Sequence, residues 1–99
     1  MDLRLDGKKA IVSGGSAGMG KAIARQLARE GCDVAIGART EAQLRQVAEE
    51  VARETGRTMV PRPLDTLDAA SIENFVKRAA ESLGAIHILA NCAARVGGT

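Results

Sequence analysis

A glycine-rich segment near the N-terminus is the part of this sequence whose residue types could bind a phosphate group. It runs from Ser13 to Lys21, reads SGGSAGMGK, and contains two overlapping phosphate-binding patterns. Counted from Gly15, the spacing Gly-x4-Gly-Lys is typical of a loop that holds a nucleoside triphosphate. Counted from Ser13, the glycine spacing is typical of a dinucleotide-binding fold. The two interpretations require different residues elsewhere, so the remaining sequence can discriminate between them.

The triphosphate interpretation lacks its magnesium ligands. Such a loop needs Ser or Thr after its lysine because that hydroxyl binds Mg²⁺, but Lys21 is followed by Ala22. It also needs an acidic residue at the end of a buried strand, whereas the apolar segment 86–91 ends in Asn91. Lys21 has a simpler interpretation as a solvent-facing residue in the first turn of a helix. An ATP- or GTP-binding domain is therefore the least favoured hypothesis for this chain.

The dinucleotide interpretation finds its requirements in place. The loop follows a predicted strand and opens a predicted helix, whose free N-terminal N–H groups attract phosphate. Gly14 allows a tight turn out of the strand. Gly18 and Gly20 allow the close approach of a pyrophosphate and close packing of the helix on the sheet.

The residue that follows the second predicted strand bears on the choice of cofactor. NAD-selective folds usually carry Asp or Glu there to bind the adenosine ribose, but this sequence has Arg39. An arginine can make bidentate, charge-assisted hydrogen bonds to a 2′-phosphate, which a carboxylate would repel. Glu41 lies nearby but fits better as a dipole partner in the first turn of the next helix. We therefore predict a preference for NADP(H), with NAD(H) possible, against the alternative that Arg39 is an ordinary surface arginine.

The elements that must position these residues alternate along the whole chain. Pro61 and Pro63 each remove a backbone donor, so the third strand is expected at a sheet edge. Right-handed crossovers then give an α/β fold with a doubly wound parallel sheet of the Rossmann type and strand order 3-2-1-4. The predicted order is strand 9–13, helix 18–30, strand 33–38, a helix between Thr40 and Gly56, a strand within 58–65, a helix between Asp68 and Gly84, and a buried strand 86–91.

Two of the predicted helices carry capping signals. Thr40 followed by Gln43 predicts a capping box, and Asp68 predicts a side-chain cap for the third helix. The apolar positions expected to face the sheet are Leu44, Val47, Ala48 and Val51 in the second helix and Ile72, Phe75, Val76 and Ala79 in the third.

Composition sets broad limits on the function. With 45% apolar and 26% charged residues, residues 1–99 read as one ordinary globular domain or part of one. The net charge of +2 is too small and too evenly spread to predict a nucleic-acid or membrane surface. The N-terminus lacks the apolar core of a signal peptide, and two cysteines do not indicate a disulfide framework, so a reducing cytoplasm is expected.

Three segments in the expected order resemble motifs of the short-chain dehydrogenase/reductase family, over essentially the whole chain. SGGSAGMG at 13–20 resembles its Thr-Gly-x-x-x-Gly-x-Gly motif, LDTLD at 64–68 its Asp-containing segment after the third strand, and NCAA at 91–94 its Asn-Asn-Ala-Gly motif. The residues that this resemblance assigns to the cofactor are Gly14, Ser16, Gly18, Met19 and Gly20 at the pyrophosphate and adenosine ribose, Arg39 at a 2′-phosphate, Asp65 and Thr66 at the adenine, and Asn91 and Ala93 along the adenosine ribose.

The sequence departs from the family pattern at several positions. Ser13 replaces Thr and keeps the hydroxyl, whereas Cys92 replaces the second Asn and Ala94 replaces Gly. No base is visible beside Cys92, so we interpret it as a small buried thiol. His87 is interpreted as structural or partly exposed, because no second metal ligand is suitably spaced. No metal site is predicted.

The catalytic residues that the resemblance implies are not in this sequence. The family uses a Ser and a Tyr-x-x-x-Lys that lie beyond residue 99, and this chain contains no Tyr. Ser71 and Ser82 fall within the third predicted helix, away from a nicotinamide. The fourth strand should pair with a fifth, so these residues alone would expose apolar surface.

The resemblance implies the N-terminal, NADP(H)-binding part of an oxidoreductase, or a truncated reading frame. When complete, the enzyme would move a hydride between nicotinamide and a carbonyl or alcohol substrate, and a homo-oligomer is expected. The alternative is a stand-alone, non-catalytic nucleotide-binding module or remnant, so whether the chain is an enzyme stays open. Neither nucleic acid nor membrane is expected as a partner.

Overall fold

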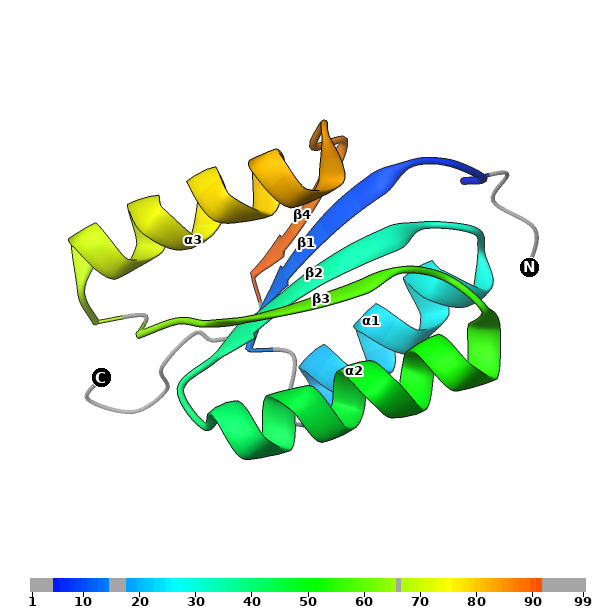
Figure 1. Ribbon diagram of the computed structural model, residues 1–99, viewed down its shortest axis with the longest axis horizontal. Coiled ribbons are helices and arrows are strands. Elements are labelled where there is room, and N and C mark those ends of the chain that lie inside the picture. The colour runs from blue at the N-terminus through cyan, green and yellow to red at the C-terminus, as the bar shows by residue number, and fades with distance from the viewer. Residues whose placement is uncertain (1–4, 15–17, 66, 92–99) are drawn as a thin grey trace.

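Four parallel strands form one sheet, with helices on both of its faces (Figure 1). The computed structural model describes residues 5–14, 18–65 and 67–91. Within these residues the strand order is β3-β2-β1-β4, which confirms the predicted doubly wound topology. The elements are β1 (Lys9–Ser13), α1 (Gly18–Arg29), β2 (Asp33–Ala38), α2 (Glu41–Thr55), β3 (Met59–Pro63), α3 (Ala69–Leu83) and β4 (Ile88–Asn91).

Alternating strand residues divide the core between the two faces of the sheet. Ala10 and Val12 of β1 belong to a cluster with residues of α1 and α2, whereas Ile11 between them belongs to a cluster with residues of α3. This is the pattern expected of a strand that is covered on both faces. Figure 1 shows α1 and α2 on one side of the sheet and α3 on the other. The predicted stripe on α2 is buried in full, at Leu44, Val47, Ala48 and Val51.

The proline-containing strand lies where the sequence placed it. β3 pairs with β2 alone among the described strands, with Pro61 opposite Ile36 and Pro63 opposite Ala38. An edge position leaves one side of the strand without a ladder, so a residue without an N–H costs little there.

The α3 face of the sheet is less covered than the periodicity predicted. The buried residues of α3 are Phe75, Ala79 and Leu83, whereas Ile72 is 41% exposed and Val76 is 37% exposed. The prediction that Ile72 and Val76 face the sheet is therefore wrong. A helix presents one stripe to a flat sheet, and the apolar residues beside that stripe need a further element to cover them.

The last strand is shorter and more exposed than predicted. β4 begins at Ile88, so His87 precedes the strand and is exposed. Ile88 and Ala90 pack against the α1–α2 cluster, while Leu89 on the opposite face is 66% exposed. The prediction of a buried strand over residues 86–91 is wrong, but the expected exposure of apolar surface is confirmed. The physical reason is that no described helix covers Leu89 and no described strand pairs with the outer edge of β4.

The two predicted N-caps have different outcomes. Thr40 occupies the N-cap position with an extended backbone, but its side chain makes no capping hydrogen bond, so the capping box with Gln43 is wrong. The backbone ladder begins instead with the Leu44 N–H, which donates to the Thr40 carbonyl at 3.0 Å. Asp68 caps α3 as predicted, because its Oδ1 accepts from the Ala70 N–H at 2.9 Å.

Candidate dinucleotide-binding site

The turn between β1 and α1 begins at a glycine in the left-handed conformation. Gly14 has φ 81°, where an L side chain would be strained, and its N–H donates to the Gly37 carbonyl at 2.6 Å. The turn is thereby fixed to the neighbouring strand β2. Ser16 lies outside the described residues, so its assigned contact with the cofactor stays a prediction.

The first turn of α1 offers room and positive potential to an anion. A Cβ added at Gly18 would meet nothing within 4 Å, so the space beside this backbone is open. The turn contains no acidic residue that would repel a phosphate. Met19 is 73% exposed at the same end, while Gly20 is buried against the sheet. The space beside Gly18 is thus open, whereas Gly20 is packed inside the fold, and their contacts with a cofactor stay predictions.

Lys21 is not poised as the lysine of a triphosphate loop. Its Nζ lies 3.4 Å from Oε2 of Glu50 on α2, within a network of ion pairs that joins the two helices. Arg25 lies in the same network, 2.8 Å from Glu50 and 3.0 Å from Glu54. The lysine therefore serves helix–helix packing, and the triphosphate interpretation gains no support from its position.

A side-chain hydrogen bond joins the carboxyl ends of β1 and β4. Ser13 and Asn91 are register partners, and the Ser13 hydroxyl donates to Asn91 Oδ1 at 2.9 Å. Ser13 is buried and Asn91 is exposed, so this bond lies where the core meets the surface. The hydroxyl that Ser13 keeps in place of Thr thus orients the side chain of Asn91. Ala93 lies outside the described residues, and its role stays a prediction.

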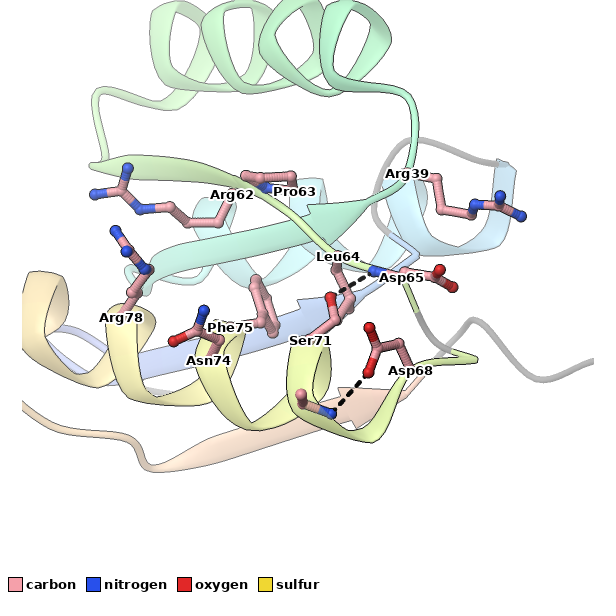
Figure 2. A pocket seen from close by; sticks show the side chains of 11 residues that line it. Arg39, Arg62, Pro63, Leu64, Asp65, Asp68, Ser71, Asn74, Phe75 and Arg78 are labelled. Carbon is pink, nitrogen blue, oxygen red and sulfur yellow. Dashed lines mark hydrogen bonds between the residues drawn. The ribbon is translucent and has the colours of Figure 1, made fainter.

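Arg39 and Asp65 come together on one cavity of about 630 Å³ (Figure 2). Arg39 is exposed and follows β2, and Asp65 follows β3. The two residues lie at the same edge of the sheet because β2 and β3 are parallel neighbours. The Asp65 Oδ1 accepts from the Leu67 N–H at 3.0 Å. This bond orients the carboxylate and leaves Oδ2 to accept from an external donor. Thr66 lies outside the described residues.

The sequence does not predict two residues that position the site. Ser71, expected only to lie within the third helix, accepts from the Asp65 N–H on its Oγ at 2.9 Å and so fixes the Asp65 backbone to α3. Gly37 supplies the carbonyl that holds Gly14, and a Cβ added to it would lie 2.6 Å from Cε1 of Phe75. A glycine inside an otherwise apolar strand was the available signal for this close packing.

The amino end of the sheet carries a charged cluster of a structural kind. Burial raises the pKa of the Asp33 carboxyl. The hydrogen bonds from Lys9 and the Thr58 N–H, together with the Arg57 charge, lower the pKa by more than burial raises it, so the pKa lies below its usual range. Lys9 Nζ lies 2.5 Å from Asp33 Oδ2 and Arg57 Nη2 lies 3.3 Å from Oδ1. The cluster ties together the starts of β1, β2 and β3, at the end opposite the cavity.

His87 has a structural role at the same end. Its N–H donates to the Lys9 carbonyl at 2.8 Å, and its Nδ1 accepts from the Lys9 N–H at 2.9 Å. In the described ranges, no group of three or more His, Cys, Asp or Glu residues is placed to hold a metal ion. None of the described helices is both long and apolar enough to cross a membrane.

Comparisons with known proteins agree with this geometry. The chain matches the short chain dehydrogenase family over residues 8–99. It is 43% identical over 89 residues to a glycine betaine reductase of Emericella nidulans, covering 90% of this chain and 7% of that protein. It is 39% identical over 90 residues to the 2,5-dichloro-2,5-cyclohexadiene-1,4-diol dehydrogenase LinX of Sphingobium indicum, covering 91% of this chain and 36% of that protein.

A solved structure is also similar. L-Sorbose reductase from Gluconobacter frateurii, complexed with NADPH and L-sorbose, superimposes with a TM-score of 0.92 at 28% identity, covering 100% of this chain and 38% of that one. The chain thus spans well under half the length of the relatives compared. On the match of residues 8–99 and on the sheet order, the chain belongs to the short-chain dehydrogenase family.

Proposed function

We propose that residues 1–99 are the N-terminal, NADP(H)-binding part of a single Rossmann domain in a short-chain dehydrogenase/reductase. When complete, such a protein would transfer a hydride between the nicotinamide and a carbonyl or alcohol substrate. The observation that carries the proposal is the shared cavity of Arg39 and Asp65 at the strand ends, beside a glycine turn that opens α1. The NADPH in the structure of L-sorbose reductase supports the choice of cofactor.

The residues of this chain fit a dinucleotide by their chemistry. The open backbone at Gly18 and the N–H groups of the first turn of α1 would hold the pyrophosphate, with Gly14, Met19 and Gly20 beside it. Ser16, which lies outside the described residues, is proposed as a further ligand of the same group. The bound nicotinamide would supply the hydride chemistry.

The adenosine half would lie along the strand ends. The exposed Arg39 would bind a 2′-phosphate, and Asp65 would accept from the adenine amino group beside the Thr66 backbone. Asn91 and Ala93 would line the adenosine ribose. Each group binds or orients the cofactor, so none is nominated as a catalytic residue.

A stand-alone nucleotide-binding module is the competing function. The exposed Leu89, Ile72 and Val76 favour the larger enzyme, because such apolar surface is normally covered within a complete domain. A cytoplasmic location and a homo-oligomer of the full-length form stay part of the proposal. A protein that carries residues 1–99 with its remaining sequence should reduce carbonyl substrates with NADPH; if it binds NADPH and reduces none, the module interpretation replaces the enzyme.

The cofactor preference is tested by calorimetric titration with NADPH and NADH. Arg39→Ala should weaken NADPH binding at least tenfold, because it removes charge-assisted hydrogen bonds worth about 1.5–3 kcal/mol, and should leave NADH binding unchanged. Arg53→Ala, at an exposed position on α2, is the matched control. If the wild-type chain and Arg39→Ala show the same preference between the two cofactors, Arg39 does not select the dinucleotide.

A further inference from the structure

The cavity between β3 and α3 has a second cationic end, away from Arg39. Arg62 on the edge strand and Arg78 on α3 both line it. In Figure 2 their guanidinium groups lie at the same end of the cavity, while Arg39 lies at the opposite end and points away from them. One end of the cavity thus lies beside the carboxyl ends of β2 and β3, and the other end lies between β3 and α3.

The guanidinium groups at this outer end have no carboxylate partner among the described residues. Arg62 Nη2 donates to the neutral Ser82 hydroxyl at 3.3 Å, and Arg62 Nε is buried without a hydrogen-bond partner in the described part of the chain. Arg57 Nε is buried in the same way, but the charge of Arg57 is balanced by Asp33 at 3.3 Å. The cations that do form ion pairs are Lys9, Lys21, Arg25, Arg29, Arg45 and Arg57.

The carboxylates of the same cavity do not neutralise the arginines. Asp65 accepts from the Leu67 N–H and Asp68 accepts from the Ala70 N–H, and both serve the local backbone at the start of α3. In Figure 2 both carboxylates lie at the end of the cavity opposite Arg62 and Arg78.

Two unpaired cations that face one partly enclosed space repel each other, and a buried N–H without an acceptor is unfavourable. An anion between them would reverse both effects. A guanidinium group presents paired N–H donors that match the oxygens of a phosphate, so two such groups from different elements suit a tetrahedral dianion better than a neutral ligand.

We propose that Arg62 and Arg78 form a binding site for a small phosphate-bearing anion, distinct from the dinucleotide site. Asn74, which lines the same cavity one turn before Arg78 on α3, offers a further polar group to the ligand. The site lies between the edge of the sheet and α3, so an occupant would not compete with a pyrophosphate at the start of α1 (Figures 1 and 2).

Inorganic phosphate is the probe, titrated calorimetrically into the full chain at low ionic strength. All proteins carry Arg39→Gln, so that phosphate cannot bind where a 2′-phosphate would. We expect saturable binding that Arg62→Gln and Arg78→Gln each weaken about tenfold, the loss of one charge-assisted contact. Arg53→Gln on α2 is the charge-matched control and should leave the affinity unchanged. Binding should also persist in saturating NADP(H).

Three results would overturn the site. The first is the absence of saturable phosphate binding. The second is an equal loss of phosphate affinity with Arg53→Gln, which indicates general charge attraction. The third is full displacement of phosphate by NADP(H), which places the anion in the cofactor site. Circular dichroism checks that each variant is folded. Because Arg78 is exposed, its substitution leaves the core intact, so Arg78→Gln decides the question if Arg62→Gln perturbs β3.

Discussion

Replacing Gly37 by alanine tests whether the close packing of α3 on β2 supports the candidate site. A Cβ at this position would lie 2.6 Å from Cε1 and 2.7 Å from Cζ of Phe75, and 3.0 Å from Cδ2 of Leu64. Phe75 and Leu64 are both buried and cannot turn into solvent. Leu64 directly precedes Asp65, so a shift of Leu64 moves the carboxylate that lines the cavity.

The expected cost follows from ordinary contact distances between carbon atoms of about 3.5–4 Å. The Phe75 ring must move by roughly 1 Å, and overpacking of this kind costs about 1–3 kcal/mol. Phe75→Leu removes the clashing ring atoms and leaves space for the new methyl group. Alone it should cost on the order of 1–2 kcal/mol. Combined with Gly37→Ala it should cost less than the sum, with a coupling energy of at least about 1 kcal/mol.

Urea unfolding of the wild type, both single variants and the double variant measures the coupling, and calorimetric titration with NADPH runs in parallel. Gly37→Ala should weaken NADPH binding, and Phe75→Leu should restore part of it in the double variant. If the two stability changes add within about 0.5 kcal/mol, the Phe75 ring and Gly37 are not in close contact, and Gly37 does not support the site through this packing.

Three further predictions concern other parts of the fold. Gly18→Ala should keep the melting temperature, because its Cβ would lie in open space, yet lower the affinity for NADPH; a loss of stability in thermal unfolding would contradict this. The pKa of Asp33 lies below its usual range, because burial, which raises it, is outweighed by the surrounding donors and cations. The ionised Asp33 therefore stabilises the fold above the ordinary carboxyl pKa, and this contribution is lost as the pH falls through the lowered pKa of the folded protein. Urea unfolding between about pH 6 and pH 2 should therefore show a weaker acid dependence for Asp33→Asn, and an unchanged slope would refute the assignment. Ser71→Ala should weaken NADPH and NADH alike, about three- to tenfold, because it releases the backbone of Asp65; Ser82→Ala is the control, and unaltered titration curves for Ser71→Ala would exclude this role.

Much of the architecture could be predicted because local patterns along this chain agree with the global fold. The apolar runs of β1 and β2 are typical of strands buried on both faces, and Pro61 and Pro63 place β3 at the edge. The strand order then places Arg39 and Asp65 at one edge of the sheet, since parallel neighbours end together. Periodicity failed for Ile72 and Val76, because it identifies apolar residues on a helix but not which stripe the sheet covers.

The sequence by itself determined the order of the elements, the glycine turn and the cationic residue after β2, because each depends on backbone freedom or residue type at fixed spacing. Only the tertiary structure decided that Ser13 orients Asn91, that Ser71 holds Asp65, and that Arg62 and Arg78 line one cavity. The reason is physical: these residues are distant along the chain or lie on different elements, and their contacts depend on strand register and helix rotation, which no local pattern specifies.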